Sequence, residues 1–236
     1  MTRPGLMNLT CHPNAETLHR VVADRLAEIA AQAIDDHGRA RLALAGGSTP
    51  MPIYRRLAAM PLDWPRVSLL PGDERWIAHS DPASNLGAMR EAFGDCPADF
   101  RPLTPANPGP EPDLATALAS YRALRGLDAC LLGMGADGHF ASLFPQAPEL
   151  RQGLDPDHPR PLIVVQPRPL PPDAPYPRIS LTLGAILASD ALLLAIRGAA
   201  KRDMLERAAE PERAAALPIS ELLKGAGDRL EIHWSP

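Results

Sequence analysis

The chain has 236 residues, 45% of them hydrophobic, which is enough for one α/β domain to bury a full core. Its formal net charge is −4, and its lysines and arginines are dispersed rather than grouped in runs, which argues against a nucleic-acid partner. Residues 1–11 lack the apolar stretch of a signal peptide, and no segment has the length of a membrane span, so we expect a cytoplasmic protein with no membrane partner.

Short apolar runs typical of strands alternate along the chain with segments that have the apolar spacing of a helix face. In chain order, the expected elements are a helix over 17–34, a strand over 41–45, a helix over 51–60, a strand over 67–71, a helix over 85–93, a strand over 127–132, short strands or extended pieces over 162–166 and 179–183, a strand over 191–196, a helix over 199–209 and a last edge strand over 229–234. This alternation predicts a single domain over 1–236, an α/β fold with a doubly wound, mostly parallel sheet, helices on both faces and room for a small antiparallel edge.

The 28 prolines cluster over 97–112 and 156–177. Because proline fixes φ and has no N–H, these stretches are predicted to be loops or extended connections, too short to link independent domains. The three cysteines, Cys11, Cys96 and Cys130, match no zinc spacing and no disulfide framework, so we expect reduced thiols, with Cys130 in the core.

Four segments rich in glycine and polar residues come directly after predicted strands, at 46–49, 72–75, 133–139 and 198–201. Ligands of open parallel sheets bind outside the carboxyl ends of the strands. We therefore expect all four segments to rim one side of the sheet and to form the functional site.

The first of these segments fits either a phosphate site or an ordinary connection between strand and helix. Gly46 and Gly47 permit a tight turn and a close approach to a ligand. Ser48 or Thr49 is expected to cap the next helix, whose free N–H groups favour an anion. Lys201, in the first turn of the predicted helix 199–209, is either a surface lysine or a partner for a phosphate.

The segment 133–138 matches the dinucleotide pattern G-x-G-x-x-G after a strand. Its late position, the limit that Pro145 sets on the helix that should follow, and the charge of Asp137 argue against a dinucleotide site. His139 comes next and is placed either for general acid–base work beside Asp137 or for capping the turn. The other six histidines have no metal-ligand spacing, so we expect no metal site.

Residues 73–75 also allow two interpretations. Asp73, Glu74 and Arg75 form either a solvated charged turn or a site where a carboxylate orients or exchanges protons and a guanidinium binds an anion. The chain has neither a G-x-S-x-G elbow nor a P-loop, which removes the main support for a serine hydrolase or an NTPase.

Taken together, these residues resemble the 6-phosphogluconolactonase family. The matching segments are LALAGGSTP (42–50), GDERW with the later SNLGAMREAF (72–93), LLGMGADGHFASLFP (131–145), RISLT (178–182) and RGAAKRDML (197–205). They occur in the family's order and span nearly the whole chain, and the block around His139 is the most specific of them.

The resemblance implies hydrolysis of 6-phospho-D-glucono-1,5-lactone, a step of the oxidative pentose phosphate pathway, by direct attack of water and without a cofactor. The small phosphorylated sugar lactone is then the partner, and the protein is a monomer or a small homo-oligomer. In this scheme His139 takes the proton from water, Asp137 orients His139, Arg75 stabilises the developing negative oxygen or holds an anionic group, and Asp73 completes the catalytic set. The candidates for phosphate binding are Gly46, Gly47, Ser48, Thr49, Arg178 and Lys201.

The same fold is shared with glucosamine-6-phosphate deaminases, whose corresponding loop reads roughly DGHIAFNEP. The glutamate of that loop belongs to the deaminase machinery, and Phe144 stands in its place here. Three alternatives therefore remain beside the lactonase: the deaminase, a nucleotide-dependent oxidoreductase and a non-catalytic sugar-phosphate sensor.

Overall fold

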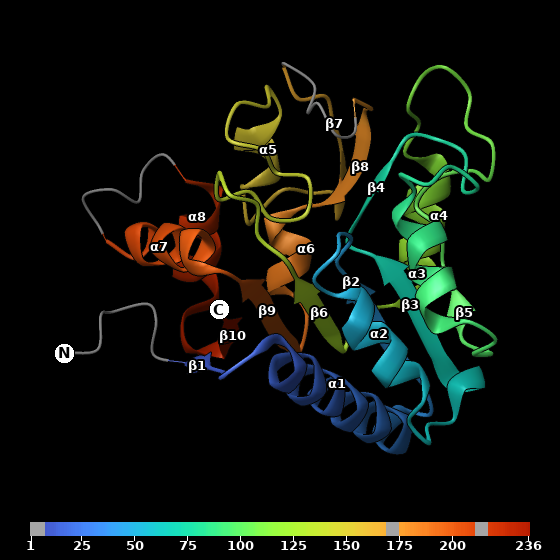
Figure 1. Cartoon of the computed structure of the whole chain (residues 1–236). Coiled ribbons are helices and arrows are strands. Elements are labelled where there is room, and N and C mark those ends of the chain that lie inside the picture. Colours follow the sequence, from blue (N-terminus) through green and yellow to red (C-terminus); the bar gives the residue numbers. More distant parts are fainter. Residues whose placement is uncertain (1–7, 169–174, 211–216) are drawn as a thin grey trace.

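The computed structural model describes residues 8–168, 175–210 and 217–236. Its centre is a parallel seven-stranded sheet in the order β1-β10-β9-β6-β2-β3-β5 (Figure 1). The strands of this sheet are β1 (Leu9–Cys11), β2 (Ala40–Leu44), β3 (Val67–Pro71), β5 (Asp99–Phe100), β6 (Ala129–Leu132), β9 (Ala191–Arg197) and β10 (Leu230–Ser235). A separate antiparallel sheet has the order β4-β8-β7, with β4 at Asp73–Arg75, β7 at Leu162–Val165 and β8 at Arg178–Leu181.

Helices cover both faces of the central sheet, and each face has its own hydrophobic cluster. One cluster joins the sheet to α1 (Ala15–His37), α2 (Met51–Ala58) and α3 (Asn85–Phe93). The other joins it to α4 (Ala115–Leu124), α6 (Leu183–Leu187), α7 (Ala199–Ala208) and α8 (Pro218–Ala226). Along β6, Leu131 belongs to the first cluster while Cys130 and Leu132 belong to the second, as the alternation of side chains along a strand requires. The expected doubly wound α/β fold is confirmed.

The shorter elements complete the described chain. They are the helix α5 (Leu150–Gly153) and the 3₁₀ turns at Trp64–Arg66 and Gly227–Arg229. Of the two proline-rich stretches, the first contains β5 and the second contains β7, while residues 169–174 of the second lie outside the described residues. No helix in the described parts of the chain is long and apolar enough to cross a membrane.

The last strand does not lie at the edge of the sheet, so that expectation was wrong. β10 pairs with β9 on one side and with β1 on the other, where Leu9 lies opposite Ile232. β1 has only three residues, too few for a pattern of alternation to predict it. The long helix α1 begins two residues earlier than expected because Asn14 caps it, its side chain accepting a hydrogen bond from the N–H of Thr17 at 2.9 Å.

Gly72 connects the two sheets. Its N–H donates to the carbonyl of Leu44 in the central sheet at 2.8 Å, and its carbonyl accepts from the N–H of Leu181 in the small sheet at 3.0 Å. Residues 73–75, for which the sequence allowed a solvated charged turn or a functional site, form the strand β4, in which Arg75 lies opposite Arg178. The small antiparallel sheet is thus anchored at the carboxyl end of β3.

Glu74 holds the helix α3 against β4. Its carboxylate is fully buried and accepts hydrogen bonds from the N–H groups of Asn85 at 2.8 Å and Leu86 at 2.7 Å, from Ser84 Oγ at 3.0 Å and from the N–H of Arg75 at 2.8 Å. Two of these donors are N–H groups of the first helical turn, which have no partner within the helix. Burial raises the pKa of the Glu74 carboxyl, although the backbone N–H groups act in the opposite direction.

We predict that Glu74→Ala lowers the free energy of unfolding by about 2–4 kcal/mol, because it leaves several buried donors without an acceptor. Urea denaturation followed by circular dichroism measures this change. The matched control is Glu28→Ala, which removes an exposed carboxylate paired with Arg25 and should cost less than about 1 kcal/mol. Equal losses in the two variants would contradict the role assigned to Glu74.

Candidate active site

A cavity of about 440 Å³ opens at the carboxyl ends of the central strands. All four segments predicted to rim the sheet contribute to its wall, which confirms their expected convergence. The residues of the predicted site that line it are Gly46, Gly47, Ser48, Thr49, Asp73, Arg75, His139, Arg178 and Lys201. Asp137 does not line the cavity but contacts His139 from outside it.

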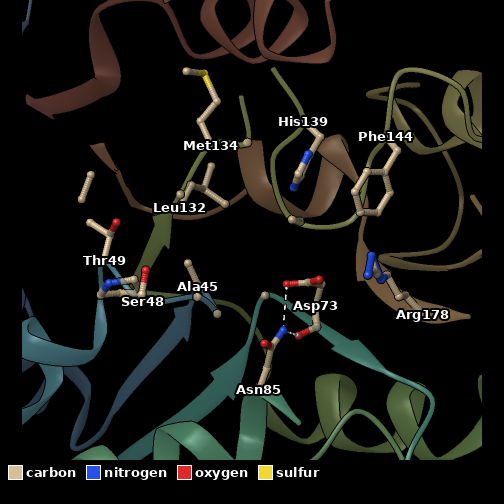
Figure 2. A pocket seen from close by; sticks show the side chains of 18 of the residues that line it. Ala45, Ser48, Thr49, Asp73, Asn85, Leu132, Met134, His139, Phe144 and Arg178 are labelled. Atoms are coloured by element: carbon tan, nitrogen blue, oxygen red, sulfur yellow. Dashed lines mark hydrogen bonds between the residues drawn. The ribbon is translucent and has the colours of Figure 1, made fainter. Parts of the chain in front are cut away.

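The turn after β2 differs from the expectation in one respect. Neither Ser48 nor Thr49 caps α2, because the chain makes a further turn over 48–50 and the helix begins at Met51 with Pro50 as the preceding residue. Both side chains instead line the cavity (Figure 2). In the described chain, the N–H groups of residues 47–49 donate to no backbone carbonyl, so they are available to an anion.

Gly46 is required for a packing reason that the sequence does not reveal. A Cβ atom at this position would lie 2.1 Å from Oδ1 of Asn85. Asn85 is buried and fixed, because its Nδ2 donates to the backbone carbonyl of Asp73 at 2.7 Å and to Asp73 Oδ1 at 3.2 Å. Gly47 has a different reason, since its φ of 93° lies in the left-handed region.

His139 and Asp137 form the closest pair of titratable groups at the cavity. Asp137 Oδ1 lies 2.6 Å from Nδ1 of His139 and also accepts the N–H of that residue at 3.2 Å. Partial burial alone would raise the pKa of the Asp137 carboxyl, but the hydrogen bonds and the charge of His139 outweigh burial and lower it. An ionised Asp137 fixes the tautomer with hydrogen on Nδ1, which leaves Nε2 as the nitrogen that can accept a proton.

Two glycines of the G-x-G-x-x-G segment allow Asp137 and His139 to come into contact. A Cβ atom at Gly135 would lie 2.2 Å from both Cε1 and Nδ1 of the His139 ring. Gly138 has a φ of 81° and closes the turn, with its N–H donating to the carbonyl of Gly135 at 3.1 Å. No helix follows directly, since the next helix in the described chain begins at Leu150. The pattern therefore lacks the helix N-terminus that a dinucleotide site needs.

Asp73 is the buried carboxylate of the cavity wall. Its Oδ2 accepts the hydroxyl of Ser142. Its Oδ1 accepts the amide of Asn85, as Figure 2 shows. Ser142 is itself buried, and its N–H donates to Ser180 Oγ at 3.1 Å. These bonds hold Asp73 in one orientation beside the cavity, which suits an orienting role better than a mobile proton carrier.

The two arginines occupy neighbouring strands of the small sheet. Arg178 is only 3% exposed, and its guanidinium lies 4.7 Å from the centre of the Phe144 ring. Burial lowers the pKa of Arg178, Asp73 acts in the opposite direction, and Arg75 lowers it further. Arg75 donates from Nη1 to the carbonyl of Ala83, and its buried Nε has no acceptor among the described residues.

Lys201 is half-buried in the first turn of α7, as expected, and lines the cavity. Burial lowers the pKa of its amine, and none of the described carboxylates forms an ion pair with it. Figure 2 places Ser48 and Thr49 on one side of the cavity and Arg178 with Phe144 on the other. The six predicted phosphate ligands therefore do not form one cluster, because Arg178 lies apart from Ser48 and Thr49.

Three residues that shape the site were not among its predicted residues: Asn85, Ser142 and Phe144, which the sequence analysis used only to distinguish the chain from the deaminases. All three belong to segments that matched the family, but nothing in their local spacing predicts their contacts across the chain. In the described residues, no group of three or more histidine, cysteine or acidic side chains is placed to hold a metal ion.

The family model described as glucosamine-6-phosphate isomerases/6-phosphogluconolactonase matches residues 13–234. The chain belongs to this family. A 6-phosphogluconolactonase of Caulobacter vibrioides is 36% identical over 97% of both chains, and one of Rhizobium meliloti is 34% identical over 97% of this chain and 99% of its own.

Solved structures of the glucosamine-6-phosphate isomerase/6-phosphogluconolactonase family share the whole fold. A 6-phosphogluconolactonase from Shewanella baltica superposes with a TM-score of 0.84 at 29% identity and covers 97% of both chains. A putative 6-phosphogluconolactonase from Neisseria gonorrhoeae superposes with a TM-score of 0.86 at 30% identity, covering 97% of this chain and 99% of its own.

We predict that Gly135→Ala separates His139 from Asp137, because the new methyl group takes the space of the imidazole. Asp137 then loses the hydrogen bonds that lower its pKa, so its carboxyl titrates at a higher pH in the variant. Carboxyl ¹³C NMR over a pH series measures this shift. The matched control is Gly133→Ala, whose methyl group has 4.0 Å to its nearest neighbour. An unmoved Asp137 titration in Gly135→Ala would show that the ring does not depend on this glycine.

Proposed function

We propose that this protein hydrolyses 6-phospho-D-glucono-1,5-lactone to 6-phosphogluconate by His139-assisted attack of water. The observation that carries the proposal is the 2.6 Å contact of Asp137 with Nδ1 of His139 at the wall of a cavity that also contains cationic side chains. The relatives named 6-phosphogluconolactonase supply the substrate class.

The reaction needs one proton carrier and no cofactor, because a lactone is already an activated ester. His139 Nε2 accepts a proton from water while the water oxygen forms a bond to the lactone carbonyl carbon. The carbonyl electron pair moves onto oxygen, and a nearby guanidinium stabilises that negative charge. When the oxyanion re-forms the carbonyl, the bond to the ring oxygen breaks, and His139 returns the proton to that oxygen. The carboxylic acid product then ionises in solution.

The placement of the cations supports a division of roles. Lys201 and the turn over 46–49 are proposed to bind the phosphate, since an amine without an acidic partner among the described residues and free backbone N–H groups both favour a dianion. Arg178 and Arg75 lie in the small sheet with Asp73 and are proposed to contact the lactone end. This assignment moves Arg178 from the expected phosphate group to the reacting group.

Phe144 argues against deamination of an amino-sugar phosphate. Its ring contacts His139 where the deaminase loop carries a glutamate, and a phenyl ring cannot exchange protons. Lactone hydrolysis needs no second proton carrier at that point. The oxidoreductase alternative loses its support with the absence of a helix after Gly138 in the described residues.

The test compares turnover of freshly prepared 6-phosphogluconolactone with ammonia release from glucosamine 6-phosphate. We expect rapid lactone hydrolysis and no ammonia. His139→Ala should remain folded by circular dichroism and lose about 10²–10⁴-fold in kcat, the usual contribution of a general acid–base group. Hydrolysis at the spontaneous rate in the wild type would identify a sugar-phosphate sensor instead. Ammonia release that depends on His139 would identify a deaminase.

We predict that Lys201→Ala raises the inhibition constant of inorganic phosphate and KM by about 10-fold or more, while kcat changes little, because a charged hydrogen bond is lost equally in ground and transition states. Competition kinetics with the lactone measure both constants. Lys224→Ala is the matched control: it removes the only other lysine of the sequence, whose side chain is 80% exposed near Glu221. Equal phosphate inhibition of the two variants would remove Lys201 from the phosphate site.

A further inference from the structure

The ring of Phe144 touches both His139 and Arg178. Its centre lies 4.3 Å from the centre of the His139 imidazole, with the planes tilted by 42°, and 4.7 Å from the carbon of the Arg178 guanidinium. Figure 2 shows the ring beside both side chains at the same end of the cavity.

The backbone around Phe144 is fixed on both sides. Its N–H donates to the carbonyl of Ser142 at 3.2 Å, and its carbonyl accepts from the N–H of Ala147 at 3.1 Å. Pro145 follows directly and restricts the backbone of Phe144 to extended conformations. The ring itself is half-buried against the core cluster that contains Leu143 and Ile179. The backbone contacts of Phe144 and the packing of its ring thus fix where the ring lies, and the ring in turn limits where the side chains of His139 and Arg178 can lie.

The face of a phenyl ring attracts cations through its quadrupole. Arg178 carries a permanent positive charge, while the imidazole of His139 becomes positive only when it accepts a proton. The other charged groups near this imidazole are Asp137 on its own loop, Asp73 and Arg75 on β4, and Lys201 on α7. Arg178 is only 3% exposed and is itself a cation, so a second positive charge on His139 is costly, and the face of the Phe144 ring offsets part of that cost.

Taking the proposed hydrolysis as its basis, we propose that Phe144 is a positioning residue for the reaction: its ring holds His139 against Asp137 and holds Arg178 at the cavity, and it stabilises the imidazole when that group becomes a cation. Phe144 itself exchanges no proton. Its effect falls on kcat, because the charged imidazole exists in the transition state and not in the ground state.

The test replaces the ring while keeping apolar bulk. In Phe144→Leu, we expect kcat for the lactone to fall about 3- to 30-fold, the worth of a cation–π contact, with a smaller change in KM. Phe144→Tyr keeps the aromatic face and should restore kcat. The matched control is Phe100→Leu, which removes a partly buried ring with Arg90 at 5.8 Å from its centre but lies outside the cavity, and which should leave kcat unchanged.

A second readout does not depend on activity. In proton NMR, the ring current of Phe144 shifts the Cε1–H resonance of His139. This resonance is assigned by its loss in His139→Gln. It should move in Phe144→Leu and return in Phe144→Tyr. If the leucine variant does not fold, Phe144→Met takes its place.

Three results would overturn the role of Phe144: an unmoved His139 resonance in the leucine variant, an unchanged kcat, or a tyrosine variant as slow as the leucine one. A wild-type protein that hydrolyses no lactone but shows the resonance shift would overturn the proposed function and leave the positioning contact established.

Discussion

The contact between Asp137 and Nδ1 of His139 is possible only because Gly135 has no side chain. At 2.6 Å it brings a carboxylate and an imidazole into the volume that any side chain at Gly135 would occupy. The loop then closes through the hydrogen bond from the N–H of Gly135 to the carbonyl of His139 at 2.8 Å, and Gly138 turns the chain in the left-handed region. Two glycines that match a nucleotide-binding pattern thus make room for the contact between Asp137 and His139 and place His139 at the cavity.

Neighbouring residues of the strand β4 have different surroundings: Glu74 is buried in the protein, and Asp73 and Arg75 line the cavity. Successive side chains of a strand point to opposite faces. Glu74 is therefore directed into the protein, where four donors fix its carboxylate at the start of α3, while Asp73 and Arg75 line the cavity. The same helix carries Asn85, which holds Asp73 and forces a glycine at position 46. The carboxylate that fixes α3 and the carboxylate that lines the cavity are adjacent in sequence because alternate side chains of a strand point to opposite faces.

The sequence was sufficient where a local rule determines position. Apolar runs located the central strands, and the rule that loops at their carboxyl ends share one edge predicts the convergence of residues 46–49, 72–75, 133–139 and 198–201. The sequence was insufficient where the conformation of a segment depends on contacts with residues far along the chain. Three residues at 9–11 become a strand only because β10 offers an unpaired edge, and the conversion of residues 73–75 into a strand depends on β8, about a hundred residues later. Ser142 and Asn85 meet Asp73 for the same long-range reason.

The cavity is lined by cationic side chains, Arg75, Arg178 and Lys201, although the net charge of the protein is −4. Burial lowers the pKa of Arg178, and the nearby Asp73 acts in the opposite direction. Lys201 has no such carboxylate among the described residues, and burial makes its charged form costly. A dianionic phosphate removes that cost, while a neutral sugar cannot. The cavity thus carries an electrostatic penalty that a substrate with a phosphate relieves, and in the proposed reaction the binding free energy gained there positions the uncharged lactone ring in front of His139.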